Sequence, residues 1–132
     1  MRYLLDTNIV FDLIRNPQGR VTDHVRRVGQ AAVCTSIIVA AELRFGATKR
    51  DSPRLTGQVE AVLAALDILA FEAPADAVYG RIRADLEATG KGIGGNDLLI
   101  AAQALVLGHT IVTDNSAEFA RIDGLPRENW LR

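Results

Sequence analysis

Short apolar, β-prone runs alternate along the whole chain with segments whose apolar residues recur at helical spacing. The runs are too short to form helices and lie at residues 3–5, 32–35, 68–71 and 110–113. The helices predicted between them lie near residues 21–28, 55–66 and 78–86. Because parallel strands are joined by helical crossovers, this alternation predicts an α/β fold. Its central, mainly parallel sheet of four to five strands is expected to carry helices on both faces.

Two more segments, residues 36–47 and 97–107, are apolar almost all the way round a helix. This pattern indicates helices buried in the middle of the structure. Near the end of the chain, residues 116–119 fit a short capped helix and residues 129–131 fit a last edge strand. A chain of 132 residues without repeats or low-complexity segments is predicted to form one domain, residues 1–132.

The composition excludes several classes of site. A single cysteine, Cys34, forms no disulfide within the chain, and with only His24 and His109 beside it a Cys/His zinc site is nearly excluded. No apolar run approaches the ~20 residues of a membrane-spanning helix, so no membrane partner is expected. Asp6 would interrupt the apolar core of a signal peptide, and the expected location is therefore the cytoplasm.

Three acidic residues stand where strands end or helices begin. Asp6 follows the first apolar run, Asp114 follows the fourth, and Asp97 opens the apolar helix. Loops and helix N-termini converge at the carboxyl edge of a parallel sheet, where ligands bind. Each acid also has a structural interpretation: a helix cap at Asp6 or Asn8, a cap by Asn96 ahead of Asp97, and an Asx turn at Asp114.

A fourth acid, Glu42, lies inside the apolar segment 37–43. An unpaired carboxylate in such surroundings is strongly destabilising, so Glu42 needs either an arginine in a salt bridge or a metal ion. Glu118, four residues after Asp114, either completes a capping box or faces the same pocket.

Carboxylates gathered at one edge of a sheet repel one another unless some are protonated or a cation lies among them. Oxygen ligands favour Mg²⁺ or Mn²⁺ over zinc, so we expect a site for a hard divalent cation. The charge balance fits this site. The chain has 15 Lys and Arg against 16 Asp and Glu, and setting the four acids apart leaves a positive excess that favours a polyanion such as RNA.

These motifs occur in a specific order along the chain. They are Leu-Leu-Asp-Thr-Asn at 4–8, Ala-Glu-Leu at 41–43, Gly-Gly-Asn-Asp-Leu-Leu-Ile-Ala-Ala at 94–102, and Val-Thr-Asp-Asn at 112–115 with Glu-Phe at 118–119. The order resembles that of PIN-domain ribonucleases, and more narrowly that of VapC-type toxins of type II toxin–antitoxin systems. The resemblance covers essentially the whole chain and implies a single PIN-like domain.

The resemblance also implies roles for the site residues. Asp6, Glu42 and Asp97 match the three principal acids of the family. Asp6 and Asp97 are expected to bind Mg²⁺ directly, and Glu42 to bind it or to orient a water. Asp114 is the expected auxiliary metal ligand and fourth catalytic acid. The residues expected to hold the acids or waters in place are Thr7, Asn8, Ser36, Thr113, Asn115 and Glu118.

The fourth position is open at this point, because relatives carry either Asp or Asn in the segment 113–115. Asp114, Asn115 and Glu118 are the three candidates.

The activity implied by the resemblance is hydrolysis of an RNA phosphodiester by a metal-activated water, leaving a 5′-phosphate and a 3′-hydroxyl. The substrate implied is tRNA or another structured RNA. The partners implied are a cognate VapB-type antitoxin and a second copy in a homodimer. Basic residues near the acids are expected to contact the RNA backbone, and the candidates are Arg15, Arg20, Arg44, Lys49, Arg50 and Lys91.

Two other readings of the acids are weaker. A haloacid-dehalogenase-like Mg²⁺ phosphatase also begins with an Asp at a strand end, but it needs a second Asp where this chain has Asn8. A non-catalytic PIN-like protein-binding module would not need its acids, whereas here all three principal acids are present.

Overall fold

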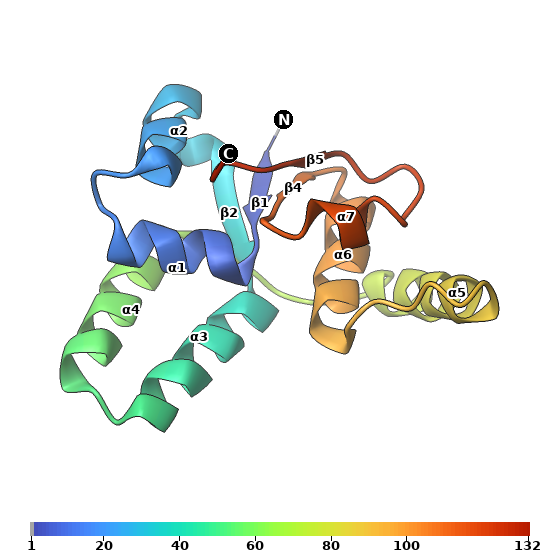
Figure 1. The fold of residues 1–132 in the computed structure, drawn as a ribbon, viewed down its shortest axis with the longest axis horizontal. Helices are drawn as coiled ribbons and strands as arrows, with labels where there is room; N and C mark the ends of the chain where they lie inside the picture. Colours follow the sequence, from blue (N-terminus) through green and yellow to red (C-terminus); the bar gives the residue numbers. More distant parts are fainter. Residues whose placement is uncertain (1) are drawn as a thin grey trace.

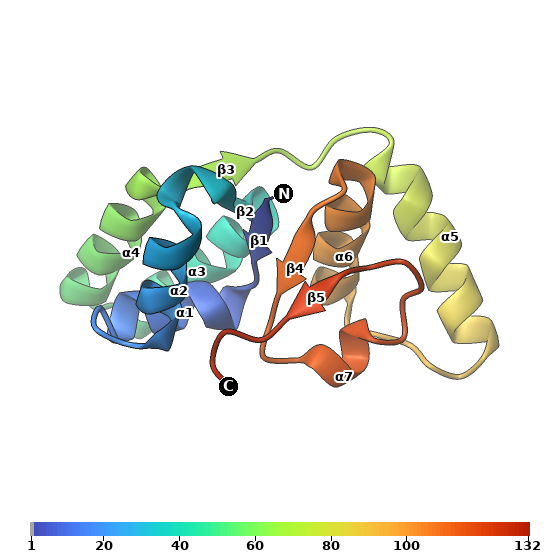
Figure 2. The same ribbon diagram turned by 90° about the horizontal axis from the view of Figure 1, so that it is seen from above.

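The computed structural model describes residues 2–132, which form a five-stranded, all-parallel sheet. The strands lie in the order β3-β2-β1-β4-β5, so β1 is at the centre (Figures 1 and 2). Their bounds are Tyr3–Leu5 (β1), Val33–Ser36 (β2), Asp67–Leu69 (β3), Thr110–Val112 (β4) and Arg127–Glu128 (β5). The predicted α/β class and parallel sheet are therefore confirmed.

Helices cover both sides of the sheet. Figure 2 shows α1 to α4 gathered on one side of the strands and α5 and α6 on the other. Their bounds are Thr7–Arg15 (α1), Arg20–Val28 (α2), Ile37–Arg50 (α3), Pro53–Ala65 (α4), Ala75–Ala88 (α5), Gly95–Leu107 (α6) and Ser116–Phe119 (α7), with a 3₁₀ turn at Gln30–Ala32. Among the described residues, no helix is long and apolar enough to cross a bilayer.

The core lies between the central strands and the helices. Leu4 and Leu5 of β1 and Ile111 and Val112 of β4 have no exposed surface. Strands covered on both faces read as continuous apolar runs, which is why these two were visible in the sequence. The prediction of a buried helix after Asp97 is confirmed, because α6 buries most of its residues from Leu98 onwards.

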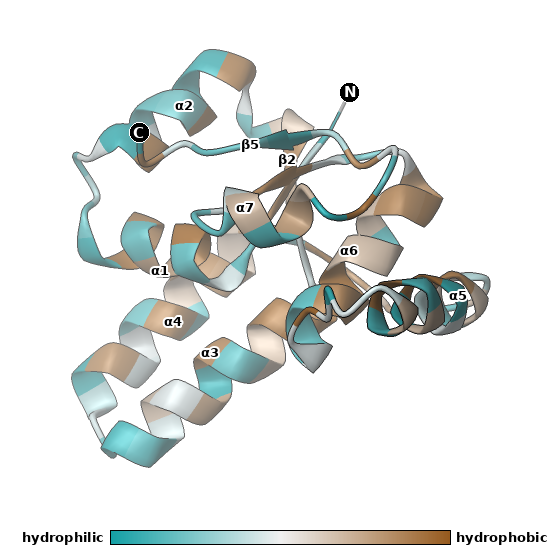
Figure 3. Cartoon of the chain, turned by 45° about the vertical axis from the view of Figure 1, so that its right-hand side comes forward, coloured by the Kyte–Doolittle hydropathy of each residue, from teal (hydrophilic) through white to brown (hydrophobic). Residues whose placement is uncertain are grey.

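The segment 36–47 was expected to be equally buried, and this expectation is wrong for one side of the helix. α3 buries Val39, Ala40 and Leu43 but exposes Phe45 and Ile37. The physical reason is that α3 packs against α1, α4 and α6 and leaves one face to solvent. Figure 3 shows hydrophobic and hydrophilic segments alternating along it.

The last edge strand lies two residues earlier than predicted. β5 pairs with β4 through Arg127 and Glu128, because the Thr113 N–H donates to the Glu128 carbonyl at 3.0 Å. Trp130 instead turns inward, and its ring stacks on His24 with centroids 4.9 Å apart. The predicted strands at 32–35, 68–71 and 110–113 are displaced or shortened by one or two residues.

Candidate active site

Asp6 lies where the central strand turns into α1. Its Oδ1 accepts a hydrogen bond from the Thr7 N–H at 2.7 Å, so the carboxylate caps the helix as the structural interpretation predicted. Its Oδ2 accepts a second bond from Thr113 Oγ1 at 2.9 Å. Asp6 is only 4% exposed. Burial is the largest effect on the pKa of Asp6 and raises it. Capping and membership of the acidic pocket are thus compatible roles.

Asp97 stands in the first turn of α6. Burial, and next the negative charge of Asp6, raise the pKa of Asp97 to about 6, and weaker repulsion comes from Glu118 and Glu42. Asn115 Nδ2 donates to Asp97 Oδ2 at 3.5 Å, which partly opposes this rise. The expected cap by Asn96 is wrong, because α6 begins at a Gly94 cap without a side-chain hydrogen bond.

Glu42 points from α3 towards the start of α1. Its Oε1 accepts a hydrogen bond from Thr7 Oγ1 at 2.9 Å, and the residue is half-buried. Within residues 2–132, Glu42 forms no ion pair with an arginine, so the salt-bridge alternative is wrong. The nearest arginine in sequence, Arg44, pairs instead with Glu60 on α4 at 2.9 Å.

The three acids share one pocket of about 330 Å³ at the carboxyl edge of the sheet. Figure 1 shows that α1 and α3 begin close together beside the end of β1. The pocket is lined by Asp6, Thr7, Asn8, Glu42, Asp97, Asp114 and Asn115. The topology explains this convergence, because β1, β2 and β4 are neighbouring parallel strands that end at the same edge.

Two predicted supporting residues are buried and do not line this pocket. Thr113 is buried and bonds Asp6, and its Oγ1 also accepts the Asn115 N–H at 2.9 Å. Ser36 is buried and caps α3, where its Oγ accepts the Ile38 N–H at 3.0 Å. Ser36 therefore orients the helix that carries Glu42 and does not line the pocket.

The candidates for the fourth acidic position differ in their surroundings. Asp114 lines the pocket, but its Oδ1 accepts from Asn129 Nδ2 at 3.2 Å and lies 3.8 Å from Arg132. Glu118 does not line the pocket, although its charge raises the pKa of Asp97. Its alternative role in a capping box is wrong, because α7 has no side-chain cap hydrogen bond. Asn115 both lines the pocket and contacts Asp97.

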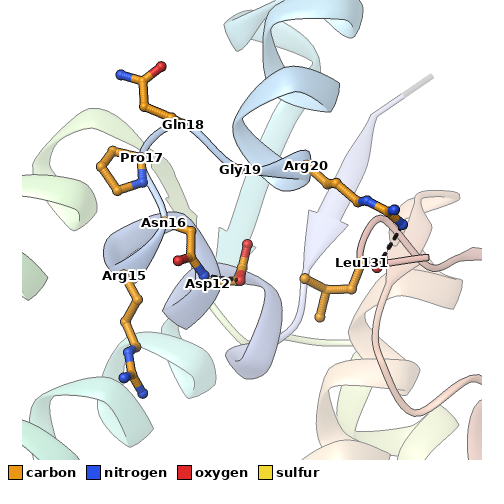
Figure 4. Close-up of a pocket in the computed structure, with 8 residues that line it drawn as sticks. All are labelled: Asp12, Arg15, Asn16, Pro17, Gln18, Gly19, Arg20 and Leu131. Atoms are coloured by element: carbon orange, nitrogen blue, oxygen red, sulfur yellow. Dashed lines mark hydrogen bonds between the residues drawn. The ribbon is translucent and has the colours of Figure 1, made fainter.

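The predicted basic residues fall into two groups. Arg15 and Arg20 line a separate pocket of about 490 Å³ between α1 and α2, where Arg20 reaches the Leu131 carbonyl at 3.4 Å (Figure 4). Arg44 is held by Glu60, so none of these three is brought to the acidic pocket.

Arg50 and Lys49 are placed differently. Arg50 lines a cavity of about 180 Å³ together with Thr7 and Glu42. Lys49 lies over the ring of Phe45, 5.9 Å from its centroid. Lys91 is exposed in the loop ahead of α6.

The acidic pocket offers oxygen ligands to a cation. In the part of the chain that the structure describes, no three His, Cys, Asp or Glu side chains already form a metal-binding group. Mg²⁺ does not need such a group, since it keeps several waters and is commonly held by one or two carboxylates. Asp6 and Asp97, whose charges repel each other, fit this requirement.

Comparison with known proteins agrees with this fold and identifies the family. The sequence model of the PIN domain matches residues 3–125. The chain therefore belongs to the PIN-domain family, and the resemblance drawn from its motifs is confirmed. Membership of the PIN-domain family excludes the haloacid-dehalogenase alternative.

Close relatives within the family are VapC ribonucleases. "Ribonuclease VapC2" of Haemophilus influenzae is 40% identical over 134 residues, with 99% of each chain covered. "tRNA(fMet)-specific endonuclease VapC" of Shigella flexneri is 35% identical over 131 residues, with 98% of each covered. This chain is accordingly a ribonuclease of the VapC type.

Solved structures show the same architecture. VapBC2 from Rickettsia felis, bound to a DNA fragment from its promoter, superposes with a TM-score of 0.91 at 35% identity, covering 98% of this chain and 99% of that one. DNA-bound VapBC from Salmonella typhimurium gives a TM-score of 0.91 at 33% identity, covering 98% of each chain.

Sequence reasoning missed two features of the site region. One is the contact of Thr7 with Glu42, which joins α1 to α3. The other is the exposed ring of Phe45 beside the acids, for which an aromatic residue three positions after Glu42 was an available signal.

Proposed function

We propose that this chain is a Mg²⁺-dependent endoribonuclease, with Mn²⁺ as an alternative ion, and the toxin of a VapBC-type toxin–antitoxin module. The observation that carries the proposal is the convergence of Asp6, Glu42 and Asp97 in one pocket. Burial, and next the charge of Asp6, raise the pKa of Asp97 to about 6, and a bound cation would relieve the repulsion between these acids.

The chemistry follows from the donor set. Asp6 and Asp97 would hold the ion, and Asp114 would assist them. When bound, Mg²⁺ supplies charge neutralisation at the scissile phosphate and acidifies a water. Glu42, oriented by the Thr7 hydroxyl, accepts a proton from the attacking water. Thr113 keeps the Asp6 carboxylate turned towards the pocket.

The proposed substrate is tRNA or another structured RNA with an accessible loop. The name of the Shigella relative, a tRNA(fMet)-specific endonuclease, supports this class. Unpaired nucleotides of a loop can enter an open pocket of about 330 Å³ more readily than a duplex can.

The proposed partners are a cognate VapB-type antitoxin and a second copy of the chain. Solved structures of VapBC complexes from Rickettsia felis and Salmonella typhimurium support the first. A homodimer, which the family resemblance implies, and a cytoplasmic location are parts of the same proposal.

The test is cleavage of purified tRNA by the protein, with Mg²⁺, with Mn²⁺ or with excess chelator. Asp6→Asn and Asp97→Asn remove the ligand charge, and Asn keeps the ability of residue 6 to cap α1. The matched control is Asp85→Asn, which changes an exposed acid on α5 outside the pocket. Cleavage should require the metal and both acids and should be unaffected by the control. Cleavage that persists in chelator would overturn the proposed mechanism.

A further inference from the structure

One face of α3 carries three different chemical groups in sequence. Glu42, Phe45 and Lys49 are spaced by three and four residues, so their side chains lie on the same side of the helix. Glu42 belongs to the acidic pocket, and Lys49 stands seven residues away, ~10 Å along the helix axis. Phe45 lies between them.

An open cleft runs along this face. It has a volume of about 660 Å³, and its apolar walls come from Ile37, Ile38 and Phe45. Asn96, at the start of α6, adds an amide to the lining of the cleft. Thr7 and Glu42 line both this cleft and the acidic pocket, so the two cavities adjoin at these residues.

Phe45 is unusually exposed for an aromatic side chain. It is 66% exposed, although such rings are ordinarily among the largest contributors to a core. Lys49 lies 5.9 Å from the ring centroid and has no ion-pair partner within residues 2–132. A flat apolar surface thus stands beside an unpaired positive charge.

We propose that Phe45 is a stacking platform for an unpaired base of the RNA substrate, next to the phosphate held at the acids, and that Lys49 contacts a neighbouring phosphate. This inference rests on the proposed function and names how its site recognises the substrate. Proteins recognise RNA loops by stacking splayed bases on aromatic rings and pairing phosphates with cations.

Two features favour RNA over a protein as the occupant of this cleft. The cleft shares Thr7 and Glu42 with the acidic pocket, so a strand whose phosphate lies at an ion held by Asp6 and Asp97 passes close to Phe45. The free ammonium of Lys49, and Arg50 in the cavity beside Glu42, complement a polyanion.

The experiment measures RNA binding in the non-cleaving Asp97→Asn background with Mg²⁺ present. The probes are a mixed-sequence single-stranded RNA of about 12 nucleotides, with length chosen to span an open groove, and an abasic strand of equal length. Four substitutions are compared: Phe45→Ala, Phe45→Leu, Phe45→Tyr and Leu107→Ala. Leu107 is the matched control, because it is 43% exposed but lies in a different pocket.

Phe45→Ala and Phe45→Leu should each raise the Kd for RNA between about fivefold and about 100-fold. Phe45→Tyr should restore binding, Leu107→Ala should leave it unchanged, and the abasic strand should not distinguish any of the variants. Full binding by Phe45→Leu, or an equal loss with the abasic strand, would overturn stacking.

Light scattering on the same variants tests the competing occupant. Suppose that Phe45→Ala halves the molar mass in solution, and that the RNA affinity of every variant changes only when its oligomeric state changes. The face is then a protein interface and the inference is wrong. Failure of the proposed function is distinguishable: it appears as a wild-type protein that does not cleave RNA. If the wild type cleaves RNA and Phe45→Ala binds RNA as tightly as its parent, the stacking inference is refuted and the proposed function stands.

Discussion

The Thr113 hydroxyl donates a hydrogen bond to the Asp6 carboxylate at 2.9 Å, which joins the ends of two adjacent strands 107 positions apart in sequence. The same hydroxyl accepts the Asn115 N–H, so one buried oxygen orients both an acid and the loop that lines its pocket. Because this bond lowers the pKa of Asp6 against the effect of burial, it favours the ionised form.

Thr113→Val should therefore reduce RNA cleavage about tenfold and lower the free energy of unfolding by about 1 kcal/mol, since it leaves two groups unpaired. The pKa of Asp6 should rise further, which moves the acidic limb of the pH–rate profile to higher pH. Thr35→Val is the control: Thr35 is also buried, but its hydroxyl bonds the Leu5 carbonyl at 2.7 Å. Thr35→Val should lower the free energy of unfolding without shifting the pH–rate profile. Equal shifts of the profile in both variants would show that the Thr113 hydroxyl does not act on Asp6 in particular.

The metal-free protein should lose stability as the pH rises through the titration of Asp97. Its pKa is raised from 3.8 to about 6 in the folded protein, so the folded state holds the proton more tightly than the unfolded chain. The free energy of unfolding should fall between about pH 4 and about pH 6, by at most about 3 kcal/mol. Urea denaturation in chelator across this range measures the change. Asp97→Asn should reduce the slope and leave the part that comes from Asp6, whose pKa burial also raises. A slope in that variant equal to that of the wild type would show that Asp97 is not the group responsible.

Added Mg²⁺ should stabilise the folded protein by binding the acidic pocket. At 100 times its Kd the ion should raise the free energy of unfolding by about 2.7 kcal/mol. Thermal unfolding at pH 7.5 should show this shift in the wild type and in Asp85→Asn, and little of it in Asp6→Asn. A stabilisation that survives Asp6→Asn would place the ion outside the pocket.

Arg50 and Arg44 should differ in their contribution to RNA binding. Arg50 lines a cavity next to Glu42, whereas Nε and Nη2 of Arg44 each donate to a carboxylate oxygen of Glu60 at 2.9 Å. Arg50→Gln should weaken binding and reduce the slope of log K against log salt by about 1. Arg44→Gln should stay within about twofold of wild type. The reverse order would show that Arg44 leaves Glu60 when RNA binds.

Much of the fold was predictable because its signals are local. The central strands Tyr3–Leu5 and Thr110–Val112 are largely buried, and so their sequences are mostly apolar. The convergence of Asp6, Glu42 and Asp97 follows from strand ends meeting at one edge, and their catalytic roles stay predictions. The limits of the domain, residues 1–132, also stay a prediction.

The rest depends on which partner each element meets, and local sequence does not record that. The position of β5 is set by pairing with β4 through exposed Arg127 and Glu128, so the apolar Trp130 misled the prediction. The exposure of Phe45 follows from how α3 packs, and the pairing of Arg44 depends on where α4 returns.

The central place of β1 in the sheet has a consequence for folding. One edge of β1 pairs with Val33–Ser36, but the other pairs with Thr110–Val112, more than a hundred residues further along the chain. Thr113 can reach Asp6 only when that distant strand is in place. A chain that folded without β4 would carry Asp6, Glu42 and Asp97 but lack the strand that holds Asp6 in its orientation, so the acidic pocket should form late in folding.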